Sequence, residues 1–410
     1  MADLNPNGSR LLCVQLGARE HYAVPRALTA AGSEVTLVTD LWSANPGGGL
    51  LQRLGQGADR FHPEVQGKVV SWNLQALIWE LGMRLLRRRG WPLIEARNRW
   101  FRRKVAGYLR SVDGAKVGGV MAYSYCAMEA LEWARDRGIP GLLGQIDPGP
   151  AEERMVRALE KNRGAYPSDA YWRHWKRETA AASRVAVNSE WSRQCLREEG
   201  IAADRTVVVP LAYELEGRSE TRSYPDCFSK DRPLRVLFLG QVIARKGVAP
   251  LLDAMAELAA ADAPVVLDVV GGGDAGLLAR AAALPNCRVL GHCRRSDAGR
   301  FYRDADVFIL PTFSDGFALT QLEAQAAGLP VIASRQCGDV VRDGVNGLLM
   351  ETVEAQSIRA SIERLLAAPA LLRACAARSA VDERFSLRSV GRAWLEAMQN
   401  ERPANTGPLS

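Results

Sequence analysis

The feature that most constrains the fold of this chain is an alternation of short apolar segments with longer helical ones, which runs through the sequence twice. In the first half the apolar segments are rich in Val, Leu and Ile, and stretches such as YAVPRALTAA and CAMEALEWARDR separate them. Such strands, apolar on both faces, are typical of a parallel sheet that helices cover on either side. Buried strands are therefore expected at 10–16, 33–40, 117–124, 139–146, 184–189 and 206–211.

The second half repeats this plan. Helical segments, among them Val248 to Ala260, separate another set of apolar runs, and a long helical stretch covers Ser357 to Asn400. Between the two halves, the residues from Tyr213 to Pro233 are rich in charge, Pro and Ser, which indicates a domain boundary. Further strands are expected at 234–240, 265–273, 287–293, 305–312, 329–334 and 346–350.

These patterns predict an α/β protein of two doubly wound, Rossmann-like domains that face a central cleft, with ligands at the carboxyl ends of the strands. We assign residues 1–212 to an N-terminal domain, 213–233 to a linker and 234–385 to a C-terminal domain. The last helix, 386–400, is expected to pack back on the N-terminal domain. Residues 401–410 are expected to form a flexible tail.

The composition excludes several classes of protein. With 410 residues, 47% hydrophobic and 24% charged, the chain is ordinary for a soluble globular protein of two domains. Its cysteines are scattered without C-x-x-C spacings, so neither a zinc site nor a disulfide framework is indicated, and no metal or cofactor is expected. No apolar run reaches the roughly 18 residues of a membrane span, and no signal peptide is evident, so we expect a cytoplasmic location.

One segment, SDGFALTQLEAQAAGLPVIAS from Ser314 to Ser334, indicates chemistry as well as structure. Good helix formers follow a short polar loop, Gly328 is a natural helix stop, and Pro330 precedes an apolar run. The segment is therefore predicted to form a loop, a helix, a turn and a buried strand.

The start of this helix is a candidate anion site. The unpaired backbone amides of the first helical turn would face a phosphate, and they belong to Gly316, Phe317, Ala318 and Leu319. Glu323, about a turn and a half inside the helix, could accept two hydrogen bonds from a diol such as a ribose. The alternative interpretations are an N-terminal cap for Asp315 and a solvated helix face for Glu323.

Two further turns in the second half belong with this segment. FLGQVIARKG ends a strand in Gly240 and brings Arg245 and Lys246 to the start of a helix, where a diphosphate could be held by charge and by amides. VVGGGD gives a turn of bare backbone centred on Gly272, which a ligand or a close loop could approach. Because each turn follows its own predicted strand, we expect both to meet Asp315 at one cleft.

The net charge of +7 is unevenly placed. The stretch from Arg84 to Lys104 is dense in Arg and contains one acid, Glu95, with Trp91, Trp100 and Phe101 among the basic residues. Interleaved basic and aromatic residues on helices suit an anionic lipid surface or an anionic acceptor, which would place the protein peripherally at the inner face of a membrane. Nucleic acid is not expected, because no nucleic-acid motif accompanies the stretch. The alternative is a solvated face whose Trp and Leu residues pack inward.

Several blocks of the sequence resemble the successive blocks of glycosyltransferase family 4: VAVNSEWSRQCLREEGI, VVVPLAYE, FLGQVIARKG, ADVFILPTFSDGFALTQLEAQAAGLPVIAS and DGVNGLLM. The resemblance covers nearly the whole chain and is strongest from about Val185 to Met350. It implies the two-domain GT-B fold and the retaining transfer of a hexosyl group from a nucleotide-diphosphate sugar, without an obligatory metal. The implied acceptor is a saccharide, which could be lipid-linked or belong to the cell envelope.

Carried onto this sequence, the resemblance implies that Glu323 binds the nucleotide ribose and that Lys246 pairs with the diphosphate. The amides of residues 316–319 would hold the distal phosphate, and Asp315 would contact the hydroxyls of the donor sugar. Near the N-terminus, QLGAREHYAV resembles the family's first glycine loop, which would place Gly17 close to the phosphates or the acceptor.

The sequence also departs from the family pattern. Family members usually have Glu at the position of Asp315 and Arg at the position of Gln241, and here Arg245 could supply the missing cation. After the strand in GLLGQIDPGP they often place a His, whereas this chain has Gln145 and Asp147.

Asp315, Asp147 and Lys246 are the candidate catalytic residues, although Asp147 could merely cap the turn before Pro148. Two rival functions stay open. One is a nucleotide-sugar epimerase on the same fold. The other is a non-catalytic sugar-nucleotide binder, which the changes at Asp315 and Gln241 make conceivable.

Overall fold

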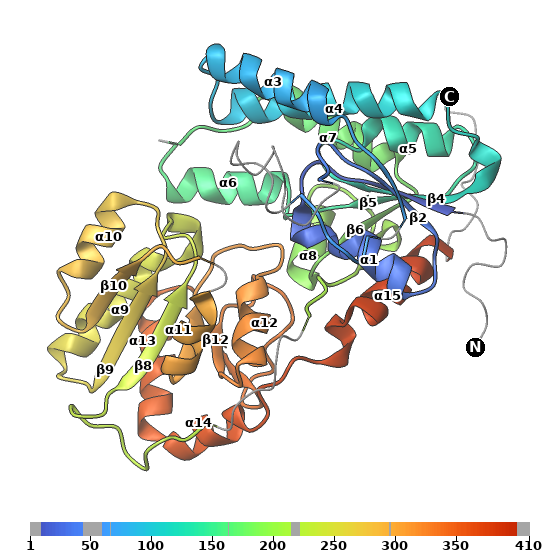
Figure 1. Cartoon of the computed structure of the whole chain (residues 1–410). Coiled ribbons are helices and arrows are strands. Elements are labelled where there is room, and N and C mark those ends of the chain that lie inside the picture. Colours follow the sequence, from blue (N-terminus) through green and yellow to red (C-terminus); the bar gives the residue numbers. More distant parts are fainter. Residues whose placement is uncertain are drawn as a thin grey trace.

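The computed structural model describes residues 10–43, 60–65, 67–162, 164–214, 222–294 and 297–399, and the predicted tail 401–410 lies outside them. Two α/β domains, each built on its own parallel sheet, lie side by side (Figure 1). The last strand of the first sheet ends at Val208, and the first strand of the second begins at Leu234. The chain therefore has the two doubly wound domains that the repeated alternation predicts.

The N-terminal sheet has the order β3-β2-β1-β4-β5-β6-β7, with every neighbouring pair parallel. The chain moves outward in one direction from β1 to β3 and then in the other from β4, so the switch point lies between β1 and β4. Edge strand β3 was not predicted, because KVV is short and half exposed. The strands are β1 Arg10–Val14, β2 Val35–Val38, β3 Lys68–Val70, β4 Val117–Tyr123, β5 Gly141–Gly144, β6 Arg184–Val187 and β7 Thr206–Val208.

Helices cover both faces of this sheet. One apolar cluster joins it to α4, α5 and α7, and a second joins its other face to α1 and α15. The helices of this domain are α1 Ala23–Ala30, α3 Asn73–Leu85, α4 Trp91–Leu109, α5 Met128–Arg135, α6 Pro150–Leu159, α7 Asp169–Ala181 and α8 Glu190–Glu198. Helix α6 lies between the α3–α4 pair and the C-terminal domain (Figure 1).

The C-terminal sheet has the order β10-β9-β8-β11-β12-β13 and is also parallel. Its strands are β8 Leu234–Leu239, β9 Val265–Val270, β10 Cys287–Gly291, β11 Val307–Leu310, β12 Val331–Ala333 and β13 Gly347–Leu349. One face packs on α9 and α13, and the other on α11 and α12. The helices are α9 Val248–Ala260, α10 Ala275–Ala282, α11 Ala298–Asp304, α12 Leu319–Ala326, α13 Ala355–Ala367 and α14 Pro369–Ala376.

The last helix, α15 (Leu387–Gln399), leaves the C-terminal domain and lies against α1 of the N-terminal domain (Figure 1). The two helices touch at Gly391, where a Cβ atom would come within 1.9 Å of the Ala27 carbonyl oxygen. Only glycine allows this approach. Within the described ranges, no helix combines the length and apolar composition that crossing a membrane requires.

Candidate active site

Lys246 and Asp315, which belong to separate sequence motifs, form an ion pair at the carboxyl edge of the C-terminal sheet. Lys246 ends the short turn Ala244–Lys246 that follows β8, and Asp315 lies in the loop after β11. Both side chains are mostly buried. The N-cap of α12 is Ala318, and no side chain caps the helix, so the interpretation of Asp315 as a helix cap is wrong.

Arg245 lies in the same cluster. Its guanidinium donates to the Ser314 carbonyl oxygen and stands 2.9 Å from a carboxylate oxygen of Glu152 in the N-terminal domain. Gln241, by contrast, has an exposed side chain. The second cation of this site is therefore Arg245, four positions after the place where the family pattern has one.

The loop before α12 supplies backbone donors, but not every one that was predicted. In the described part of the chain, the N–H groups of Gly316, Phe317 and Leu319 have no hydrogen-bond partner. The prediction is wrong for Ala318, whose N–H donates to the Cys337 carbonyl oxygen at 3.1 Å. A Cβ atom on Gly316 would lie 2.5 Å from the Ile146 carbonyl oxygen, so glycine is needed here because the two domains touch.

The glycine cluster after β9 has a mixed role. Cβ atoms on Gly271 and Gly273 would lie 1.8 and 2.2 Å from carbonyl oxygens of Gly240 and Val242, so these two glycines let neighbouring loops pack together. Gly272 is different, because a Cβ atom there would meet nothing within 4 Å. It is the only one of the three that faces open space.

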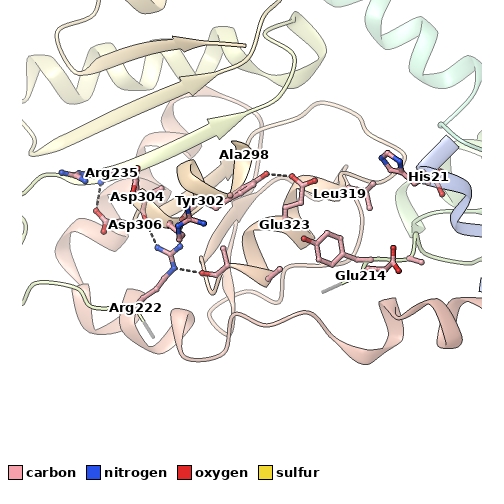
Figure 2. A pocket seen from close by; sticks show the side chains of 18 of the residues that line it. His21, Glu214, Arg222, Arg235, Ala298, Tyr302, Asp304, Asp306, Leu319 and Glu323 are labelled. Carbon is pink, nitrogen blue, oxygen red and sulfur yellow. Dashed lines mark hydrogen bonds between the residues drawn. The ribbon is translucent and has the colours of Figure 1, made fainter. Parts of the chain in front are cut away.

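Glu323 lines a large cavity between the two domains, of about 1060 Å³. Its carboxylate accepts a hydrogen bond from the Tyr302 hydroxyl at 2.7 Å, and Figure 2 shows this pair on one wall with Leu319. His21 and Glu214 stand on the opposite side. Glu323 is therefore half-buried at the wall of a cavity and has a partner within the protein. Burial raises the pKa of Tyr302 well above its ordinary value, and the Glu323 charge raises it further, so this hydroxyl stays protonated as a donor.

The cavity and the ion-paired cluster are neighbours along α12, but the cluster does not line the cavity. The residues that line the cavity include Leu319 and Glu323 and leave out Lys246 and Asp315. At the start of α12 the space is closed by two ion pairs, Lys246 with Asp315 and Arg245 with Glu152. A ligand with a diol at Glu323 and an anion at Lys246 would have to exchange these pairs for contacts of its own.

On the N-terminal side, Asp147 belongs to a tight polar network. One of its carboxylate oxygens accepts hydrogen bonds from the Tyr125 hydroxyl, from Gln145 Nε2 at 3.1 Å and from the Gly149 N–H at 2.8 Å. Trp175 Nε1 in turn donates to Gln145 Oε1 at 2.9 Å. Asp147 does cap its turn, and the network also fixes the direction of its carboxylate.

Glu152, in the first turn of α6, is a functional candidate that was not identified from the sequence. It lies opposite Arg245, and burial raises its pKa to about 7. This value already includes the charges of Asp147 and Asp315, which raise the pKa, and those of Arg245 and Lys246, which lower it. The sequence PGPAEE could have identified it. These residues place an acid in the first turn of the helix that follows β5, and the ends of such strands face the cleft.

The first glycine loop reaches the cavity through the residues after its glycine. Gly17 has a φ of 85° and donates its N–H to Asp40 Oδ1 at 3.0 Å. Glu20, His21 and Tyr22 then all adopt positive φ angles, a costly conformation for residues with side chains. Glu20 and His21 both line the cavity, and burial raises the pKa of Glu20 to about 7.

Comparison with known proteins agrees with this geometry. Residues 233–368 match the family model described as group 1 glycosyl transferases. Curated relatives include the D-inositol 3-phosphate glycosyltransferase of Geodermatophilus obscurus, 32% identical over 222 residues, which are 49% of each chain. That of Rhodococcus opacus is 32% identical over 245 residues, or 55% of this chain and 54% of the relative. These similarities support a glycosyltransferase of the GT4 type, and the family model itself matches the C-terminal domain.

Solved structures place this chain in the GT-B fold. Anabaena HepE in complex with UDP superimposes with a TM-score of 0.63 at 17% identity, over 95% of this chain and 99% of that one. WaaG, a glycosyltransferase involved in lipopolysaccharide biosynthesis, gives a TM-score of 0.61 at 16% identity, over 95% and 100%. Both likenesses concern the fold. The chain spans only about half the length of the two curated relatives, so its reaction and substrates have to be argued from the site.

Proposed function

We propose that this glycosyltransferase transfers a hexosyl group from a nucleotide-diphosphate sugar to an acceptor hydroxyl, with retention at the anomeric carbon and without a metal. The observation that carries the proposal is the cluster at the start of α12. There Lys246 pairs with Asp315 of its own domain, Arg245 faces Glu152 of the other domain, and nearby backbone amides are free. A diphosphate leaving group needs that positive side, and a sugar with its hydroxyls suits the acidic one.

The donor would lie along α12. Its ribose diol would bind Glu323, whose carboxylate Tyr302 already orients by donating a hydrogen bond. Its diphosphate would take the place of Asp315 on Lys246 and accept from the amides of Gly316 and Phe317. The complexes of Anabaena HepE with UDP and with UDP-glucose support a uridine donor as the first one to test.

The same contacts would favour bond breakage. As the bond between the anomeric carbon and the diphosphate oxygen breaks, negative charge grows on the leaving group, where fixed cations and amides stabilise it. Positive charge grows on the sugar ring, as in other glycosyl transfer reactions. Asp315 from one domain and Asp147 from the other would face that ring, and the acceptor hydroxyl would enter on the N-terminal side.

The test is the release of free nucleoside diphosphate from candidate donors, with and without acceptors, beginning with UDP-glucose and D-inositol 3-phosphate. A transferase releases the diphosphate in step with a new glycoside, and NMR of the product shows whether the anomeric configuration is retained. Interconversion of donor sugars without release would identify an epimerase. Binding of donors in calorimetry without any turnover, across the acceptor panel, would identify a non-catalytic binder.

A further inference from the structure

Large hydrophobic side chains that are exposed gather in one place on this protein. Across the described ranges, all of them but Leu290 lie on α3, directly after it or in the first turn of α4. They are Leu74, Ile78, Leu81, Leu85, Leu86 and Ile94. An apolar patch this concentrated is typical of an interaction surface, whereas isolated exposed apolar residues are not.

Four of these residues form a continuous row on α3. Leu74, Ile78, Leu81 and Leu85 are spaced by four, three and four positions, so they share one face of the helix. Their exposed fractions are 71%, 62%, 59% and 77%. We call these four residues the α3 row.

The opposite face of α3 already has its partner. Ala76 is buried, and the ring of Trp79 lies 5.9 Å from that of Trp100 on α4. The α3 row is therefore a second apolar face, and it is not needed to hold the helix on the domain. A surface helix normally gives that position to polar residues.

Positive charge surrounds one end of the α3 row. Arg84 and Arg87 to Arg89 are exposed where α3 ends and the chain turns toward α4. The nearby acids have partners of their own, because Glu80 pairs with Arg97 and Glu95 accepts from Ser168. The aromatic residues of the basic stretch do not contribute, since Phe101 is fully buried and Trp91 and Trp100 pack against the core. The inward-packing interpretation thus holds for them.

We propose that the α3 row inserts into the interfacial region of an anionic lipid bilayer, with the arginines on its headgroups. Apolar residues on one helical face beside a dense cluster of arginines are the combination that such an interface binds. Helix α3 lies on the outer side of the N-terminal domain, away from the C-terminal domain (Figure 1), so membrane contact leaves the cleft open. If the proposed function holds, this docking brings the cleft to an acceptor carried by the membrane.

The experiment is co-sedimentation of the full chain with phosphatidylcholine vesicles, with or without about one third phosphatidylglycerol. Wild-type protein should bind the anionic vesicles, and binding should fall at high salt. Ile78→Ser with Leu81→Ser should weaken binding at least about tenfold, through the lost apolar burial. Reversal of Arg87, Arg88 and Arg89 to Glu should weaken it by about 100-fold.

Matched controls lie at the far end of the molecule, on the C-terminal domain. Reversal of Arg342, Arg364 and Arg378 to Glu changes the net charge by the same amount on exposed positions, and Leu290→Gln removes an exposed apolar side chain. Both should bind vesicles as wild type does. Calorimetry with UDP needs no membrane, so failure to bind UDP would count against the proposed function while leaving the vesicle result intact.

Two outcomes would overturn the proposal. One is an absence of anionic vesicle binding, or equal losses in the control variants. The other is a concentration-dependent dimer in analytical ultracentrifugation that Ile78→Ser with Leu81→Ser abolishes, without vesicle binding. That result would assign the α3 row to a second copy of this chain. If the protein is a monomer and does not bind vesicles, the membrane assignment is also refuted. The α3 row would then be assigned to a different protein partner.

Discussion

The two sides of the cleft differ in their polar groups, because only the C-terminal side adds cations and free amides to its acids. The C-terminal side presents Lys246, Arg245 and backbone N–H groups at the start of α12, all of which attract anions. The N-terminal side presents Asp147 and Glu152, held by a network of neutral donors or by ion pairing across the cleft. The proposed function uses this difference, with the cations and amides on the leaving phosphate and the N-terminal carboxylates beside the sugar.

The largest expected effect comes from removing the positive end. Lys246→Ala should lower kcat/KM for sugar transfer by at least about 100-fold, because an ion-paired donor aimed at a developing anion is lost. The measurement is steady-state release of nucleoside diphosphate, with binding of free UDP followed in calorimetry. Lys230→Ala is a matched control, since it removes a lysine from an exposed ion pair with Asp262 in the same domain. Equal activity of the two variants would place the phosphate site elsewhere.

A variant of Asp315 distinguishes contact with the sugar from contact with the diphosphate. Asp315→Asn should reduce turnover by about 10- to 100-fold if the carboxylate contacts the sugar as the bond breaks. Free UDP should bind as tightly as to wild type, or more tightly, because Asp315 competes with the diphosphate for Lys246. Parallel transfer assays and calorimetry check both parts. Unchanged transfer would remove Asp315 from the reaction, and weaker UDP binding would move it to the phosphate site.

The C-terminal side was largely predictable from the sequence, whereas on the N-terminal side Asp147 was predicted and Glu152 was not. Lys246 and Asp315 follow strands and Glu323 lies inside the helix that comes after Asp315, which are local patterns. Glu152 and Arg245 meet only because two domains close on each other, and the Tyr302 hydroxyl reaches Glu323 from another helix. Ala318 was predicted wrongly for the same reason, since the partner of its N–H lies in the loop after β12.

The fold itself was predictable from the alternation of apolar strands and helices, because a buried parallel strand has to be apolar over its whole length. The short edge strand β3 was not predicted, because three half-exposed residues do not form an apolar run. The exposure of the α3 row was not predicted for a different reason. Apolar residues at a spacing of four, three and four predict a helix face, and that pattern is the same whether a core or a membrane covers it.

Glu152 offers a test of charge on the acidic side. Its pKa of about 7 lies above its ordinary value of 4.5, so it is largely ionised only at higher pH. A bound diphosphate nearby adds negative charge and raises this pKa further. Wild-type protein should therefore take up protons when UDP binds at about pH 7.5 to 8, and UDP affinity should fall as pH rises through this range.

The uptake is measured by calorimetry in two buffers of different ionisation enthalpy. Glu152→Gln should abolish it, because the amide does not titrate. Glu153→Gln is the control, since Glu153 lies on the same helix and pairs with Arg157. Uptake that survives in Glu152→Gln would show that another group titrates on binding. The comparison between variants also removes the contribution of the nucleotide's own phosphate.

The smallest expected effect concerns the orientation of Glu323 at the nucleoside end. Tyr302→Phe removes the hydroxyl that donates to this carboxylate, and one neutral donor to a charged acceptor contributes about 1 to 2 kcal/mol. Glu323 keeps its place on α12, so only part of this free energy is lost and UDP affinity should fall about three- to tenfold. Because Tyr302 acts through Glu323, the loss should be absent in a Glu323→Gln background and absent for inorganic pyrophosphate, which carries no ribose. A similar loss for pyrophosphate would mean that Tyr302→Phe disturbs the packing of α11 on α12, rather than the recognition of the diol.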